Sequence, residues 1–244
     1  MVKKILRIVL WVVTGAALIV LFVAGRKWYL ETPLKGIRVD LERSQMNGFV
    51  DSDSLLAYAE AVCGMARHNK IENIDMQGIN KLLSRNPWIE RGSAYIDLND
   101  TLFIKAKEYE PVLRVFYPNG TSVYVTTEGT VIPSSPRYTP HLLIASGHFD
   151  QDADIADALA IAQAISNDKY LTEHIGQIYL NQDKEYEVTV NNLPAKVIVG
   201  DTCFINDKLA RLRTLLEKYN NTEELIGYKA LDLKYKNQIV CTKK

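Results

Sequence analysis

The longest apolar segment of the chain lies near its beginning, where no charged residue occurs between Ile8 and Gly25. This segment, IVLWVVTGAALIVLFVAG, has eighteen residues. At a rise of 1.5 Å per residue, a helix of this length spans about 27 Å, close to the roughly 30 Å hydrocarbon core of a bilayer. The two apolar residues before Arg7 lengthen the span, because the Arg7 side chain can reach toward water. The pattern predicts one transmembrane helix over residues 5–25.

The flanks of this segment bear on its orientation and on its retention. Residues 1–27 contain five basic residues and no acidic one, and the basic residues stand on both sides of the span. The slight excess on the leading side, together with a tail of residues 1–4 too short to form a domain, favours a cytoplasmic N-terminus. A cleaved signal peptide is the competing interpretation. It needs a shorter apolar core and a small residue three positions before the cleavage site, whereas Phe22 holds that position for a site after Ala24.

After a predicted tether over residues 26–35, the apolar pattern changes to strand and helix periods. Alternating apolar positions predict a strand at 37–42, and positions at helical spacing predict two helices, from about 52 to 63 and from about 75 to 86. Strands at 89–98 and 101–108 follow, with Leu98 expected on the apolar face of the first. We therefore predict a small domain over 36–108 with the order strand, helix, helix, strand, strand.

The remaining chain, residues 109–244, is dominated by strand patterns. Strands are predicted at 112–117, 121–126, 130–132, 141–146, 175–181, 185–190, 195–199, 228–235 and 238–242, and helices at 152–167 and 206–219. The predicted fold class is thus α+β: one transmembrane helix, a small mixed domain, and a β-rich C-terminal domain with flanking helices.

Charge and cysteine content narrow the function classes. The formal net charge of the whole chain is zero, but residues 28–244 alone carry a net charge of −5 because the first 27 residues are purely basic. A mildly acidic domain lacks the clustered lysine and arginine that nucleic acid requires, so we expect no nucleic-acid partner. Three cysteines, Cys63, Cys203 and Cys241, are too few and wrongly spaced for a disulfide framework or a metal site. We expect small buried side chains, and leave open a bond between Cys203 and Cys241.

The residues that could support catalysis do not form a recognisable site. The four histidines occur without a metalloprotease or paired Cys/His spacing. Asp150, Asp152 and Asp154 resemble the start of a calcium loop, but the loop's glycine and its bidentate glutamate are replaced by Ile155 and Ile161. Acidic residues at a helix start are the better interpretation. We therefore expect a protein that is not an enzyme, with no cofactor, metal or small-molecule substrate.

Four ordered stretches resemble the bacterial cell-division family FtsQ/DivIB. They are Ile79-x-x-Leu82-Leu83-x-x-Asn86-Pro87-Trp88-Ile89; Leu102-x-Ile104-x-x-x-Glu108-x-x-Pro111-Val112; Tyr124 through Glu128-Gly129-Thr130-Val131-Ile132; and Lys208-x-x-Arg211-Leu212-x-x-Leu215-Leu216 followed by Leu231-Asp232-Leu233-Lys234-Tyr235. Each stretch is short, but together they cover most of the chain behind the predicted anchor. The resemblance implies that residues 36–108 form a POTRA domain.

The resemblance also implies a role in the division machinery. Members of the FtsQ/DivIB family are single-pass proteins of the bacterial inner membrane. Most of the chain lies in the periplasm, and the proteins are enriched at the septum. They bridge FtsB-like and FtsL-like partners and septal wall-synthesis proteins, and a partner segment adds to the edge of the last strands. The partner-binding residues implied here are Leu231, Leu233, Tyr235, Asn237, Ile239 and Val240. Lys234 and Gln238 depart from the family's usual arginine and glycine, and the family's terminal tryptophan is absent.

Three alternatives remain at this stage. Leu231 and Leu233 could be core residues beside an idle sheet edge. The chain could be another POTRA-bearing envelope protein, involved in secretion or envelope assembly, which would lack the stretch from Asp232 to Tyr235. A wall-active enzyme on a membrane tether is the third, and it would need catalytic residues that the sequence does not offer.

Overall fold

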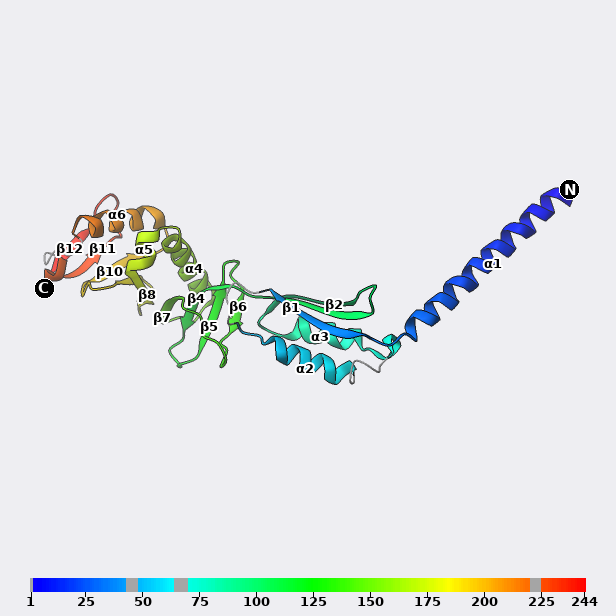
Figure 1. Cartoon of the computed structure of the whole chain (residues 1–244). Coiled ribbons are helices and arrows are strands. Elements are labelled where there is room, and N and C mark those ends of the chain that lie inside the picture. Colours follow the sequence, from blue (N-terminus) through cyan, green and yellow to red (C-terminus); the bar gives the residue numbers. More distant parts are fainter. Residues whose placement is uncertain (1, 43–47, 64–69, 220–224) are drawn as a thin grey trace. The chain divides into compact units, whose positions relative to one another are not determined.

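The computed structural model describes residues 2–42, 48–63, 70–219 and 225–244, which divide into two compact units, Met1–Glu108 and Tyr109–Lys244. Each unit is described by itself. The first contains α1 (Val2–Leu30), β1 (Gly36–Glu42), α2 (Ser52–Cys63), the short 3-10 helix η1 (Ile71–Asn73), α3 (Met76–Arg85), β2 (Ile89–Ile96) and β3 (Thr101–Glu108) (Figure 1).

Helix α1 carries the apolar segment and fits a single membrane crossing. The stretch Val9–Leu30 is long and apolar enough to span a bilayer, and none of it is buried against the rest of the chain. The helix continues through Leu30, five residues beyond the span expected from the sequence, so half of the expected tether is helical. It stops three residues before Pro33, which cannot donate the next helical hydrogen bond.

Strands β1, β3 and β2 form a three-stranded sheet in that order, with β1 parallel and β2 antiparallel to the central strand. Helices α2 and α3 cover one face (Figure 1). The central strand turns Leu102, Ile104 and Ala106 into the core between sheet and helices. A Cβ on Gly92 of β2 would lie 2.7 Å from the Leu83 Cβ of α3, so this glycine permits the close approach of helix and sheet.

Glu108 has a structural role in the first unit. It is buried at the end of β3, and its carboxylate accepts hydrogen bonds from the backbone N–H groups of Phe49 (2.9 Å) and Val50 (3.0 Å). These two residues precede α2. A buried carboxylate is tolerated where it receives such bonds, and here it fastens the start of the helix layer to the sheet.

The prediction for Leu98 was wrong. Strand β2 ends at Ile96, and Leu98 lies in the following turn with 100% of its side chain exposed. The Asp97 carboxylate causes this, because it accepts hydrogen bonds from the backbone N–H groups of Asn99 (2.9 Å) and Thr101 (2.8 Å). An aspartate that captures the backbone in this way makes a turn and ends the strand.

The second unit is built on a nine-stranded mixed sheet in the order β12-β11-β10-β9-β8-β7-β4-β5-β6. Its elements are β4 (Pro111–Phe116), β5 (Ser122–Thr126), β6 (Val131–Pro133), β7 (Leu143–Gly147), α4 (Asp152–Ser166), α5 (Lys169–His174), β8 (Ile175–Leu180), β9 (Tyr186–Val190), β10 (Lys196–Gly200), α6 (Ile205–Lys218), the 3-10 helix η2 (Leu225–Gly227), β11 (Tyr228–Asp232) and β12 (Val240–Lys243).

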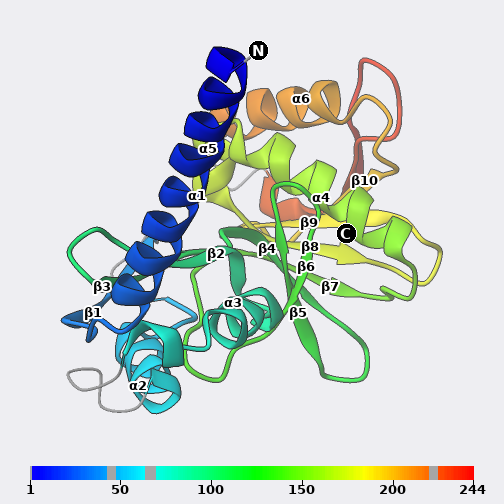
Figure 2. The same ribbon diagram turned by 90° about the vertical axis from the view of Figure 1, so that its right-hand side faces the viewer.

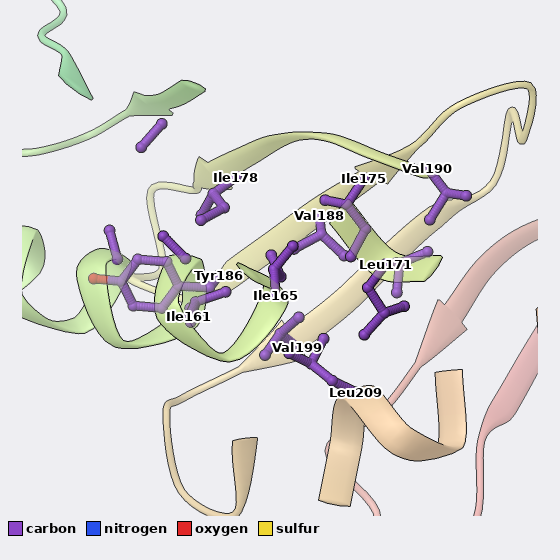
Figure 3. Packing of buried hydrophobic residues seen from close by; sticks show 14 of the residues in the cluster. Ile161, Ile165, Leu171, Ile175, Ile178, Tyr186, Val188, Val190, Val199 and Leu209 are labelled. Carbon is purple, nitrogen blue, oxygen red and sulfur yellow. The ribbon is translucent and has the colours of Figure 1, made fainter. Parts of the chain in front are cut away.

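Helices α4, α5 and α6 lie on one side of this sheet (Figure 2). The apolar face of α4 packs on the central strands, where Ile161 and Ile165 meet Ile178 and Val188 (Figure 3). Gly147 at the end of β7 has a φ of +118°, and a Cβ there would lie 2.1 Å from the Leu180 carbonyl oxygen. Only glycine fits this close approach between the ends of the paired strands β7 and β8.

The six-residue helix α5 was not predicted. It begins after Asp168, whose carboxylate accepts hydrogen bonds from the backbone N–H groups of Tyr170 (2.9 Å) and Leu171 (3.2 Å) and also pairs with Arg213 at 2.9 Å. A helix this short has too few turns to show a hydrophobic period. Its N-cap is therefore the only local sequence signal for it.

Candidate partner-binding edge

Strand β12 ends the order of the nine-stranded sheet, and within the described residues its outer side pairs with no other strand. Its inner side pairs antiparallel with β11 through Asp232↔Val240 and Leu231↔Cys241. β11 in turn runs parallel to β10. The terminal strand thus offers an open edge, the feature that strand addition requires.

The direction of the β12 backbone groups follows from one hydrogen bond. The Lys244 N–H donates to the Gly227 carbonyl at 3.2 Å, on the β11 side. Successive N–H groups of a strand alternate in direction, so the N–H groups of Val240 and Thr242 also face β11. Those of Cys241 and Lys243, with their carbonyls, face outward. These two residues are the backbone donors and acceptors available to an added strand.

The structure divides the predicted site residues between core and surface. Leu231 and Leu233 are 0% exposed and belong to the core under the helices. Ile239 is half-buried against the same core. Tyr235, Asn237 and Val240 are exposed, with 50% exposure for Tyr235 and 40% for Val240. Leu231 and Leu233 can therefore support the edge but cannot contact a partner with their side chains.

The strand predicted over residues 228–235 ends three residues earlier in the structure, so Tyr235 does not continue the strand that carries Leu231. β11 ends at Asp232, whose carboxylate accepts a hydrogen bond from the Lys234 backbone N–H at 2.9 Å. Leu233 still lies beside β10, since its N–H donates to the Ile198 carbonyl at 2.8 Å. Tyr235 lies beyond this point, in the turn toward β12.

Arg211 of α6 holds this turn. Its Nη1 donates to the Tyr235 carbonyl at 2.7 Å and to the Gln238 carbonyl, and its Nη2 donates to the Leu233 carbonyl at 3.2 Å. One guanidinium thus donates hydrogen bonds to three carbonyls, which lie at both ends of the turn. Asn237, with a φ of +59°, provides the left-handed residue that closes it.

A second contact anchors the same turn to the middle of the sheet. The Lys234 ammonium contacts the Glu185 carboxylate at 2.7 Å and the Asp232 carboxylate at 3.7 Å. The hydrogen bond to Glu185 raises the pKa of Lys234, and Asp232 adds to the effect. The Lys234 side chain passes over Gly200, where a Cβ would lie 2.7 Å from its Cγ. The turn is therefore preorganised by contacts from α6, from Glu185 just before β9, and from Gly200 at the end of β10.

Sequence reasoning missed Phe204, which precedes α6. Phe204 has a φ of +53° and is 80% exposed, two unusual properties for a bulky apolar residue. Left-handed backbone at such a residue is strained and tends to occur at functional sites. The preceding loop is held by Lys208, which is buried and donates to the Asp201 carboxylate at 2.7 Å. A phenylalanine where a capping residue is expected was the available signal.

The acidic helix start behaves as expected from the sequence. Asp154 accepts hydrogen bonds from the backbone N–H groups of Asp150 and Gln151, both at 3.1 Å, and Lys184 contacts Asp150 and Asp154. The carboxylates thus serve the start of α4 and an ion pair. Among the described residues, no group of three or more His, Cys, Asp or Glu side chains is placed to hold a metal ion.

Cys203 and Cys241 are both free thiols. Cys203 is exposed in the turn before α6, whereas Cys241 is half-buried in β12, and burial raises the pKa of the Cys241 thiol. The side chain of Cys63 lies outside the described residues. The disulfide left open by the sequence is therefore not formed in this structure.

The comparison with protein families decides the identity. The family model described as FtsQ/DivIB, C-terminal related, matches residues 110–242, more than half of the 244 residues. The chain belongs to the FtsQ/DivIB family. A search of curated proteins found no match. FtsQ/DivIB proteins are membrane-anchored, non-enzymatic cell-division proteins, and the apolar helix α1 fits a single-pass anchor. The matched residues include β11 and β12 as far as Thr242, and Lys243 lies one residue beyond the match.

Proposed function

We propose that this FtsQ/DivIB protein is a divisome scaffold that binds FtsB-like and FtsL-like partners by adding a partner segment to the outer edge of β12. The observation that carries the proposal is the open edge itself, with outward backbone groups at Cys241 and Lys243. Tyr235, in the turn before β12, and Val240, at the start of β12, present exposed side chains beside this edge. Backbone pairing would supply affinity, and these side chains would supply specificity.

The proposal extends to the rest of the chain. The order β1, α2, α3, β2, β3 supports a POTRA domain at 36–108, with residues 109–244 forming the β domain. A cytoplasmic N-terminus places both units in the periplasm, where wall-synthesis proteins are further partners at the septum. A POTRA protein of secretion or envelope assembly is disfavoured, because the family match covers the C-terminal part in which such a protein would differ.

The sharpest test replaces Lys243 by proline. Lys243 is an exposed residue at the end of the strand whose N–H faces outward, so proline removes a donor for the added strand without removing a bond to β11. With the full chain in lipid nanodiscs, we expect affinity for a reconstituted FtsB–FtsL-like complex to fall about tenfold or more. Lys243→Ala is the matched control, and it should bind nearly as tightly as the native chain.

Equal affinities for the proline and alanine variants, with unchanged thermal unfolding of both, would show that the partner does not pair with this edge. Removing residues 228–244 is a less clear experiment, because it also takes Leu231 and Leu233 out of the core. A fluorescent fusion tests the cellular role. A ring at mid-cell agrees with a divisome protein, whereas uniform envelope fluorescence contradicts the proposal.

A further inference from the structure

The link between the membrane helix and the first unit is fastened to that unit. The Ile71 N–H donates to the Thr32 carbonyl at 3.0 Å, and the Lys35 N–H donates to the Asp100 carbonyl at 2.8 Å. The Lys35 ammonium also contacts the Asp100 carboxylate at 2.8 Å. Between these contacts Leu34 is 1% exposed. The five residues after Leu30, numbered 31–35, span at most about 18 Å even when extended.

This arrangement defines which end of the three-stranded sheet lies nearest the bilayer. β1 starts at Gly36, directly after the link, and pairs in parallel with β3 from Thr101 onward. The turn between β2 and β3 therefore lies at the end where the chain arrives from the membrane. Leu98 stands on this turn with 100% exposure, more than any other large apolar side chain in the described part of the chain.

An aromatic pair, exposed Tyr95 and half-buried Phe103, lies next to the same end. Tyr95 and Phe103 stack with ring centroids 5.6 Å apart and an interplanar angle of 10°. Arg38 lies 6.0 Å from the centre of the Phe103 ring, and the Lys105 ammonium lies 5.9 Å from that of Tyr95. Leu102 and Ile104 face the helices, so these residues occupy the opposite, open face of the sheet. Tyr95 is 41% exposed.

We propose that the turn carrying Leu98, with the adjacent Tyr95–Phe103 pair, rests in the outer headgroup layer of the bilayer that α1 crosses. A fully exposed leucine has no stabilising contact within its own unit, whereas the apolar boundary below the headgroups offers one. Aromatic rings beside basic side chains suit this layer, because one part of each group is apolar and the other is hydrated. The short link keeps this end of the sheet near the membrane surface, within the roughly 18 Å that the link can reach.

The exposed aromatic residues Trp28 and Tyr29, at the end of α1, belong to the same region of the membrane surface. The turn would therefore add a second point of contact between the first unit and the lipid. This contact would restrict the tilt of the unit relative to the membrane. The proposed lipid contact does not involve β12. An experiment can therefore disprove this contact while the proposed binding of a partner to β12 remains valid.

The test uses the full chain with its three native cysteines replaced by alanine. An environment-sensitive fluorophore is attached at Leu98→Cys and, as the matched control, at Arg91→Cys, an exposed position at the other end of β2. The proteins are reconstituted in vesicles of phosphatidylethanolamine and phosphatidylglycerol. A fraction of the lipids carries bromine near the headgroup end of the acyl chains, within the roughly 5–10 Å reached by interfacial side chains.

We expect the label at position 98 to emit at shorter wavelength and to lose about half of its intensity to the brominated lipid, since bromine at the depth of interfacial side chains quenches by contact. The label at position 91 should show neither effect. Equal spectra and equal, weak quenching at both positions would overturn the proposal. A blue shift at position 98 that rises with protein density and is insensitive to bromine would overturn it too, because it identifies a second copy of the chain as the contact.

Discussion

Replacing Arg211 by alanine removes the guanidinium that binds the carbonyls of Leu233, Tyr235 and Gln238. A hydrogen bond in a partly exposed setting contributes about 0.5–1.5 kcal/mol net. Three such bonds, two of which share one nitrogen, suggest about 2 kcal/mol for the order of the turn. This corresponds to a change of about 30-fold in the local opening equilibrium.

Amide hydrogen exchange measures this opening directly. The N–H groups of Val240 and Thr242, which face β11, should exchange about 30-fold faster in Arg211→Ala, because β12 detaches when the turn opens. The amides of the central strands should be unaffected, since Arg211 lies outside the core cluster. Partner affinity should fall by no more than the same factor, which is the cost of ordering the turn on binding.

Arg213→Ala is the control for this prediction. Arg213 lies on the same helix, but its guanidinium binds Asp168 at 2.9 Å and Glu217 at 2.8 Å, away from the turn. Exchange in β12 should remain as in the native chain. If β12 exchanges at the native rate in Arg211→Ala, or equally fast in both variants, then Arg211 does not hold the edge.

Three further predictions separate the contributions to stability. Leu231→Ala should lower the free energy of unfolding of the second unit by about 2–5 kcal/mol in denaturant titrations, whereas Tyr235→Ala should change it by less than about 1 kcal/mol because half of the ring is exposed. Gly147→Ala should be strongly destabilising in thermal unfolding, since the added Cβ would overlap the Leu180 carbonyl. A native melting temperature would contradict the close approach of β7 and β8 at this residue. The hydrogen bond from Lys208 lowers the pKa of Asp201. This pair therefore stabilises the fold above the unfolded pKa of about 3.9 and loses its effect as the pH falls through the lower native pKa. Asp201→Asn should make the free energy of unfolding less dependent on pH in the acid range, and an unchanged dependence would exclude the pair as a contributor.

The elements with a clear hydrophobic period could be predicted from the sequence. Helices α2, α3, α4 and α6 and the buried strands form where their apolar positions recur at the expected spacing. The two strand ends that were placed two or more residues too late, those of β2 and β11, have one cause. Asp97 and Asp232 each capture a backbone N–H two residues on, and the chain turns there despite apolar residues beyond, namely Leu98 and Leu233. The alternation of apolar and polar residues alone does not show that an aspartate side chain competes with the strand for backbone N–H groups.

The candidate site could be predicted only in part. Alternation placed Leu231 on an apolar face, but it could not tell a core face from a docking face, because both are apolar. Arg211 was visible as part of a motif, yet its acceptors lie 22, 24 and 27 residues away along the chain. Contacts of this length depend on how α6 packs over the sheet. No local pattern encodes them.

The Arg211 contacts have a consequence for how this surface can diverge between related proteins. All three acceptors are main-chain carbonyls, so the hydrogen bonds from Arg211 do not depend on which side chains the residues of the turn carry. Substitutions at exposed positions such as 235 and 238 can alter the side-chain chemistry shown to a partner while the Arg211 hydrogen bonds remain. The exposed side chains of the turn between β11 and β12 can therefore change together with a partner while the backbone of the turn keeps its geometry.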